Sequence, residues 1–157
     1  MTWLEVCQDK SLRDLPYKVE LNRLGKIEMS PHRRHHGLFQ GRLSLLLGKL
    51  LHQGEVVVEC AIDTSDGVRV ADVAWVSSAR WASMSDSPSC SIAPEICIEV
   101  VSEANSAVEL THKRVLYFQA GAIEVWQCDG KGVLTFFSSK GEVSDSSVCP
   151  GFPKSVA

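Results

Sequence analysis

The spacing of apolar residues changes several times along the chain, and each change marks a predicted element. Residues 17–30 (YKVELNRLGKIEMS) contain two short alternating runs on either side of Asn22 to Gly25, which predicts a β-hairpin. After Pro31 the apolar positions take helical spacing, and this pattern ends at Gly54. The positions that define this predicted helix are Phe39, Leu43, Leu46 and Leu50.

The rest of the chain predicts one more helix among several strands. Residues 94–102 and 122–129 are apolar on both faces, which is typical of covered strands in a parallel arrangement, and a helix over 106–121 connects them. Together with the hairpin and the first helix, this pattern predicts an α/β fold with a mixed sheet. The other predicted segments are strands over 55–62, 68–76 and 132–139 and a polar, Ser-rich loop over 77–93.

Within the helix over 106–121, Ser106 and Glu109 have the spacing of an N-terminal capping box. Lys113 and Tyr117 are four residues apart and therefore share one face. A different face is expected to form the principal core stripe, because it carries Ala104, Val108, Val115 and Phe118.

Composition and charge narrow the possible classes of protein. The 157 residues are 45% hydrophobic and 22% charged, which predicts one soluble globular domain over residues 1–157. A net charge of -3 excludes a general polyanion-binding surface, so nucleic-acid binding would need a local basic patch. Residues 1–10 lack the features of a signal peptide, and the apolar run at 43–51 is too short to span a membrane, so we expect a cytoplasmic protein with no membrane partner. The six cysteines are scattered without zinc-type spacing and are expected to be reduced.

Two acidic residues interrupt strands that are otherwise apolar, Asp72 in VRVADVAWV and Glu99 in ICIEVVS. Burying an ionised carboxylate without a partner costs several kcal/mol, so each must be held by something. A backbone N–H or an arginine could satisfy one such residue within the core. Two on successive strands also fit a site for Mg²⁺ or Mn²⁺, which prefer carboxylate oxygens, and the spacing alone leaves both interpretations open.

The order of these residues resembles the Uma-type restriction endonuclease family, a branch of the restriction-endonuclease-like PD-(D/E)XK superfamily. The resemblance rests on ADVAWV at 71–76, on IEVVSEANSAVELTHKRVLYFQAGAIEVWQCD at 98–129 and, more loosely, on residues 17–43. It implies a restriction-endonuclease-like mixed β-sheet core flanked by helices. It also implies a metal-dependent phosphodiesterase site.

Carried over to this sequence, the resemblance makes Asp72 and Glu99 metal ligands, and the backbone carbonyl of Val100 a third ligand. On this interpretation a metal ion holds the buried carboxylate of Glu99. Glu20 matches a family glutamate that could contact metal-bound water, and Glu28 is a rival for that role. The sequence does not choose between these two glutamates.

The sequence departs from the motif at two positions. Ala71 replaces the proline before Asp72, and Val101 stands where the motif lysine would fall. The resemblance implies that Lys113 on the following helix supplies the lysine, which would orient the attacking water and offset charge on the phosphate. Taken without the resemblance, Lys113 instead suits a surface ion pair with Glu109, four residues before it.

Other residues are weaker candidates for binding nucleic acid. Arg33 and Arg34 in HRRHH (32–36) could contact phosphates at the start of the first helix, or could belong to a solvated loop. His36 matches a family histidine at that position, and a histidine-rich zinc site is not expected, because a fourth ligand is lacking. Tyr117 could bind a phosphate or hold Lys113 in place.

Two residues of the strand over 122–129 also match the family pattern. Glu124 could pair with a basic residue near the site, and Trp126 is expected in the core.

These observations predict a Mg²⁺- or Mn²⁺-dependent nuclease that acts on DNA or RNA, with DNA as the expected substrate and a homodimer as a plausible assembly. The alternative is a non-catalytic domain of the same fold that acts in nucleic-acid binding or assembly. Its support is the missing lysine at position 101, the missing proline at position 71 and the small number of clustered basic residues. The Ser-rich segment over 77–93 is the expected place for sequence specificity.

Overall fold

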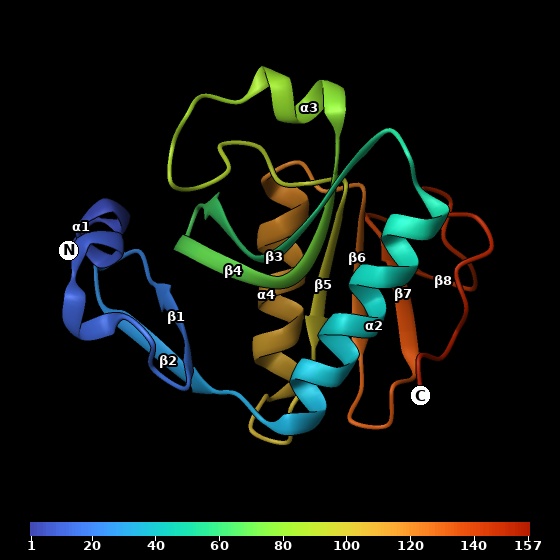
Figure 1. Cartoon of the computed structure of the whole chain (residues 1–157), viewed down its shortest axis with the longest axis horizontal. Coiled ribbons are helices and arrows are strands. Elements are labelled where there is room, and N and C mark those ends of the chain that lie inside the picture. Colours follow the sequence, from blue (N-terminus) through green and yellow to red (C-terminus); the bar gives the residue numbers. More distant parts are fainter.

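One mixed β-sheet of eight strands organises the chain in this computed structural model, which describes residues 1–157 (Figure 1). Seven strands follow the order β2-β1-β4-β5-β6-β7-β8, and β3 pairs with β4 off this path. Only β5 and β6 run parallel to each other, and the other pairs are antiparallel. The strands are β1 (Tyr17–Leu21), β2 (Ile27–Pro31), β3 (Gly54–Thr64), β4 (Gly67–Ser77), β5 (Ile96–Val100), β6 (Glu124–Cys128), β7 (Leu134–Ser138) and β8 (Gly141–Val143).

Four α-helices and one short 3₁₀ helix complete the fold. None of the helices is both long and apolar enough to cross a membrane. The hydroxyl of Ser106 caps the second long helix by accepting from the backbone N–H of Glu109, so half of the predicted capping box forms. The elements are α1 (Trp3–Gln8), a 3₁₀ helix (Lys10–Leu12), α2 (Arg34–Leu50), α3 (Ser78–Ser83) and α4 (Ala107–Gln119). The Ser-rich segment therefore contains a short helix, α3, instead of being a loop throughout.

Strand β4 is the centre of the sheet. Its whole length pairs with β3 along one edge. Along the other edge it pairs with β1 at Val68 and with β5 from Val73 to Trp75. Between Val68 and Val73 this edge has no backbone pairing, and the side chains of three strands meet there.

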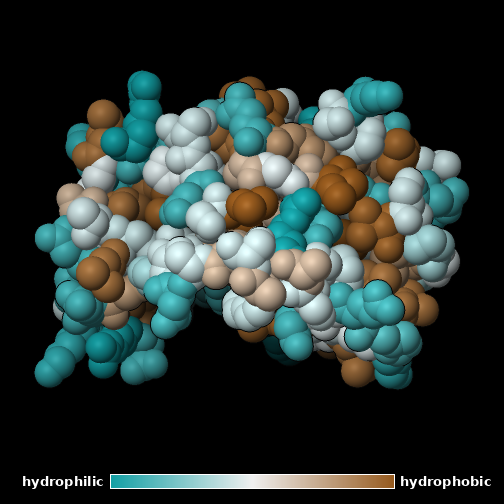
Figure 2. Space-filling model, turned by 90° about the horizontal axis from the view of Figure 1, so that it is seen from above, coloured by the Kyte–Doolittle hydropathy of each residue, from teal (hydrophilic) through white to brown (hydrophobic).

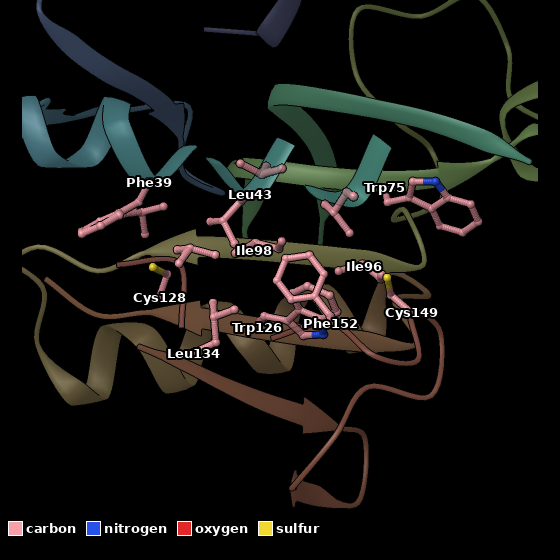
Figure 3. Close-up of a cluster of buried hydrophobic side chains, with 14 of the residues drawn as sticks. Phe39, Leu43, Trp75, Ile96, Ile98, Trp126, Cys128, Leu134, Cys149 and Phe152 are labelled. Atoms are coloured by element: carbon pink, nitrogen blue, oxygen red, sulfur yellow. The ribbon is translucent and has the colours of Figure 1, made fainter. Parts of the chain in front are cut away.

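The two long helices cover opposite faces of the sheet. Alternate residues of a strand point to opposite faces, and Ile98 belongs to a buried cluster with Leu43 of α2, whereas Cys97 belongs to a buried cluster with Tyr117 of α4. The cluster on the α2 face is the larger of the two and also contains Trp126 and residues of the C-terminal segment (Figure 3). Trp126 is fully buried, as expected.

The predicted core positions of the first helix are mostly right. Phe39 and Leu43 are buried in α2, and Leu46 packs against the same cluster. Leu47 occupies the core position that we expected for Leu50, which is 42% exposed. Leu50 is the last residue of α2, whereas Leu47 lies one turn after Leu43 and packs in the same cluster.

The predicted core stripe of α4 is wrong. Val108 is 80% exposed and Val115 is 47% exposed, whereas Lys113 and Tyr117 are buried together with Leu116. The face of the sheet beneath α4 carries buried carboxylates. The helix therefore turns its basic and hydroxyl side chains toward the sheet, where they pair with these carboxylates, and its valines face outward. On the face seen from above, hydrophobic residues form small patches between polar ones (Figure 2).

All six cysteines are free thiols. Five of them are buried or half-buried, and Cys7 is exposed. The sulfur atoms of Cys60 and Cys90 lie 3.7 Å apart, beside the edge of β3.

Candidate active site

Asp72 and Glu99 face each other where β4 and β5 separate. The last backbone pair of these two strands joins Val73 to Ile98, and the two acidic residues are the next ones along each strand. Asp72 is 1% exposed and Glu99 is 6% exposed. Two like charges directly across a strand pair repel each other, so a cation is required between them.

Lys18 of β1 supplies that cation. Its Nζ lies 3.0 Å from Oδ1 of Asp72 and 2.9 Å from Oε2 of Glu99, and it is itself buried. Although burial alone lowers the pKa of Lys18, the carboxylates of Glu99 and Asp72 raise that pKa well above its usual value. Lys18 is therefore a charged ammonium group.

Asp72 has two further partners. The backbone N–H of Val100 donates to its Oδ2 over 2.7 Å, and Nε2 of His36 lies 3.2 Å from its Oδ1. Burial raises the pKa of Asp72, but the ammonium of Lys18 and the His36 contact outweigh burial and hold that pKa well below its usual range. The same contact, against the opposing effect of burial, raises the pKa of His36.

Glu99 is held by three protein donors. In addition to Lys18, the hydroxyl of Tyr117 donates to its Oε1 over 2.6 Å, and Nζ of Lys113 donates to the same oxygen over 3.2 Å. Burial raises the pKa of Glu99 in spite of the two lysines. Burial and the adjacent Glu99 carboxylate also raise the pKa of Tyr117. Protein partners are thus available for this carboxylate whether or not a metal ion is bound.

Glu20 completes the cluster, and Glu28 lies elsewhere. Oε1 of Glu20 lies 2.7 Å from Nζ of Lys113 and accepts from the backbone N–H of Val70 over 2.8 Å. Glu28 is instead paired with Arg69 over 2.5 Å, with its side chain 47% exposed. The geometry therefore favours Glu20 over Glu28. Lys113 contacts Glu20 and Glu99, not Glu109, so the predicted surface ion pair does not form.

Sequence reasoning missed Lys18. It stands two residues before Glu20 in an alternating strand, a pattern that resembles the solvated face of a hairpin. The pattern did carry one relevant indication, because alternation places Lys18 and Glu20 on the same side of β1. The partnership with Asp72 and Glu99 depends on how β1 meets β4, which the sequence pattern does not encode.

The residues predicted to bind nucleic acid divide into two groups. Arg33 and Arg34 are exposed, and Arg33 pairs with Glu103 over 3.4 Å at the surface. His36 points inward to Asp72. Tyr117 is fully buried and its hydroxyl donates to Glu99, and its contact with a phosphate stays a prediction.

A second group of ligand-type side chains adjoins the cluster. His32, His36 and Glu59 place one ligand atom each within 4.8 Å of one another. Glu59 lies on β3 with a positive φ of 50°, and the amide of Gln40 donates both to Glu59 and to the backbone carbonyl of Asp72. The histidine spacing alone could not predict the contribution of β3 to this group.

Glu124 belongs to the core instead of the site. Its carboxylate accepts from Nε1 of Trp126 and from the hydroxyl of Ser146. It also accepts from two backbone N–H groups, those of Ser147 and Val148. The expected pairing with a basic residue is therefore wrong, because the polar groups of the C-terminal segment satisfy this carboxylate.

The donor set fits a hard divalent cation. Asp72 and Glu99 direct carboxylate oxygens toward one point, which is the chemistry that Mg²⁺ and Mn²⁺ prefer. Val100 adjoins this point through its backbone N–H. Its carbonyl as a third ligand stays a prediction.

This mixed sheet, with helices on both faces and an acidic cluster where strands separate, defines a nuclease-like α/β fold. The chain belongs to the Uma2 family, described as "Putative restriction endonuclease", whose model matches residues 9–152. The fold is similar to that of a "putative nuclease belonging to DUF820" from Anabaena variabilis ATCC 29413. That similarity has a TM-score of 0.65 at 18% identity and covers 79% of this chain and 73% of the other. No curated protein matches the sequence significantly. The family and the fold predicted from the sequence are thus confirmed.

Proposed function

We propose that this protein is a divalent-metal-dependent nuclease that hydrolyses phosphodiester bonds of nucleic acid. The observation that carries the proposal is the convergence of Asp72 and Glu99, two buried carboxylates on neighbouring strands, on one cation position. The family and the fold support it, since restriction-endonuclease-like proteins generally use divalent metal ions. A structural role alone does not require two acids opposite each other at the point where two strands separate.

Asp72 and Glu99 would hold Mg²⁺ or Mn²⁺. The ion would supply positive charge for the phosphate and lower the pKa of a bound water. Lys113, held between Glu20 and Glu99, keeps an ammonium group next to the reacting position, where it can donate to a phosphate oxygen or orient the attacking water. Tyr117 fixes the carboxylate of Glu99 by its short hydrogen bond.

The proposed substrate is DNA. Arg33 lines a cavity of about 290 Å³ beside the cluster, together with Ser102 and the backbone of Gly130. Arg34 is exposed next to it at the start of α2. Because the net charge is -3, few phosphate contacts are available, and binding should be weak and depend on salt. Cutting both strands would need two active sites, which a homodimer in the cytoplasm would provide.

The test is Mn²⁺ binding by calorimetry together with cleavage of supercoiled plasmid DNA. Asp72→Asn and Glu99→Gln should each abolish saturable binding and cleavage. Glu28→Gln is the matched control, since it removes a carboxylate from the neighbouring hairpin and should preserve both. Denaturant unfolding of each variant separates lost binding from lost folding. Metal binding and cleavage that survive in both site variants would refute the proposal.

A non-catalytic role is the second candidate, and one observation favours it. Both oxygens of Asp72 and both oxygens of Glu99 have protein partners, so the cluster is satisfied without a metal ion. In that case the wild type would bind DNA but neither bind Mn²⁺ nor cleave. The same two assays therefore distinguish the candidates.

A further inference from the structure

We propose that Lys18 is a built-in cation of this site and that a divalent metal ion binds only after the Lys18 ammonium group has left. This inference rests on the proposed function, because it concerns the same two carboxylates. Nζ of Lys18 lies 3.0 Å from Asp72 and 2.9 Å from Glu99, which is the position that a shared metal ion would need. Lys18 and a metal ion therefore compete for the same oxygen atoms.

Space at the cluster excludes simultaneous occupancy. Lys18 is 7% exposed, and the cavity that remains between it, Asp72 and Glu99 has a volume of only about 20 Å³. Such a volume holds about one water molecule. Mg²⁺ usually retains several waters when it binds to carboxylates. The side chain of Lys18 must therefore withdraw before a partly hydrated ion can enter.

The charge of the cluster leads to the same conclusion. With His36 neutral, the carboxylates of Glu20, Asp72 and Glu99 and the ammonium groups of Lys18 and Lys113 together carry one net negative charge. Exchanging Lys18 for a dication makes this buried group neutral. Adding the dication beside Lys18 would leave one net positive charge in a low-dielectric environment, which is costly.

The fold gives Lys18 room to move. Strand β1 pairs with β4 only through Leu21 and Val68, so the backbone at Lys18 is not hydrogen-bonded to β4. Its backbone partner is Ser30 of β2, and the two strands form a hairpin that stands to one side of the long helices α2 and α4 (Figure 1). Withdrawal of a long, unbranched side chain from this position requires no change within the central sheet.

Replacing Lys18 tests the competition directly. In Lys18→Met the affinity for Mn²⁺, measured by calorimetry, should rise at least about 10-fold, because the binding-competent state no longer needs an unfavourable withdrawal. The thermal midpoint of Lys18→Met should also rise more on adding Mn²⁺ than that of the wild type. Lys26→Met is the matched control, since it removes the same charge from an exposed position of the hairpin and should leave the affinity unchanged.

Lys113→Met distinguishes two effects on Mn²⁺ affinity: occupation of the shared cation position by a lysine, and the loss of one buried positive charge. Lys113 contacts Glu99 and Glu20 but not Asp72, so its loss removes a buried positive charge without vacating the shared position. Competition for the position predicts a clearly smaller gain in affinity for Lys113→Met than for Lys18→Met. Equal gains in the two variants would overturn the inference, since they would show that only net charge matters.

The outcomes also separate this inference from the proposed function. Equal Mn²⁺ affinity in the wild type and Lys18→Met would overturn the role of Lys18 and leave the metal site intact. Absence of binding in both would overturn both proposals, whereas binding in Lys18→Met alone would support the competition in its strongest form.

A second measurement covers the case in which Lys18→Met does not fold. Acetylation of the wild type by an activated ester, located by mass spectrometry, should increase at Lys18 when Mn²⁺ is bound and stay constant at Lys26. Saturation with Mn²⁺ without any increase at Lys18 would contradict the inference.

Discussion

The hydroxyl of Tyr117 donates to Oε1 of Glu99 over 2.6 Å, and both side chains are almost completely buried. This bond links the central helix α4 to the strand that carries the second acid of the candidate site. It holds one carboxylate oxygen in place, while the other oxygen faces Lys18. The position of Glu99 is therefore set from the helix side of the sheet.

Removing this hydroxyl should destabilise the protein. Tyr117→Phe takes away a hydrogen bond to a charged group, which contributes about 1.5–3 kcal/mol. The free energy of unfolding, measured with urea, should fall by about that amount. Tyr17→Phe is the matched control, because Tyr17 is 43% exposed and its change should stay within about 0.5 kcal/mol. Equal stability of the two variants would mean that the Tyr117 bond contributes nothing.

Glu124 should behave as a structural carboxylate, unlike Glu99. It accepts four hydrogen bonds from Trp126, Ser146, Ser147 and Val148, and all four donors would lose their partner in Glu124→Ala. We expect the free energy of unfolding to fall by about 3 kcal/mol or more.

Although Glu124→Ala should lose stability, it should not lose metal binding. Mn²⁺ affinity should be unchanged in folded Glu124→Ala, since this carboxylate contacts none of the cluster residues. Glu142→Ala, at an exposed position of β8, should change neither stability nor affinity. A loss of Mn²⁺ binding in folded Glu124→Ala would show that the two carboxylates are coupled.

The elements were predictable because their sequence periods are clear and their turns carry glycine. The hairpin at 17–30, both long helices and the strands that carry Asp72 and Glu99 all form as expected. The proximity of Asp72 and Glu99 was also predictable, because they lie on successive strands. Periodicity identifies which residues share a face, and that information was sufficient for these elements.

Periodicity does not identify which face is buried when buried charges are present. In β1 the polar face, with Lys18 and Glu20, is buried, although on the apolar face only Leu21 is buried and Tyr17 is 43% exposed. In α4 the valines are exposed, and Lys113 and Tyr117 face the sheet. In both elements the carboxylates on neighbouring strands decide the orientation, and that information is not local in sequence.

The core on the α2 face should respond strongly to truncation. Leu43 is completely buried among residues of four strands and the C-terminal segment, so Leu43→Ala should lower the free energy of unfolding by about 2–5 kcal/mol. Leu45, two residues on, is 59% exposed, and Leu45→Ala should cost less than about 0.5 kcal/mol. Urea unfolding of the pair measures the difference, and similar values for both would contradict the assignment of this helix face.

Asp66, in the turn between β3 and β4, should make stability depend on pH in acid. The contact with Nε2 of His112 lowers its pKa most, burial opposes this, and the N–H of Arg23 and the guanidinium of Arg69 lower it further, to about 2. Because the folded pKa lies below the ordinary value of 3.8, Asp66 stabilises the protein above about pH 4.

This stabilisation is lost as the pH falls toward 2. Asp66→Asn removes the titrating group, so its free energy of unfolding should change less between pH 4 and pH 2 than that of the wild type. Asp145→Asn, at an exposed position without a basic partner, should retain the full slope of the wild type. Identical slopes for Asp66→Asn and the wild type would show that the contacts of Asp66 do not stabilise its charged form, because a depressed folded pKa requires the loss on acidification.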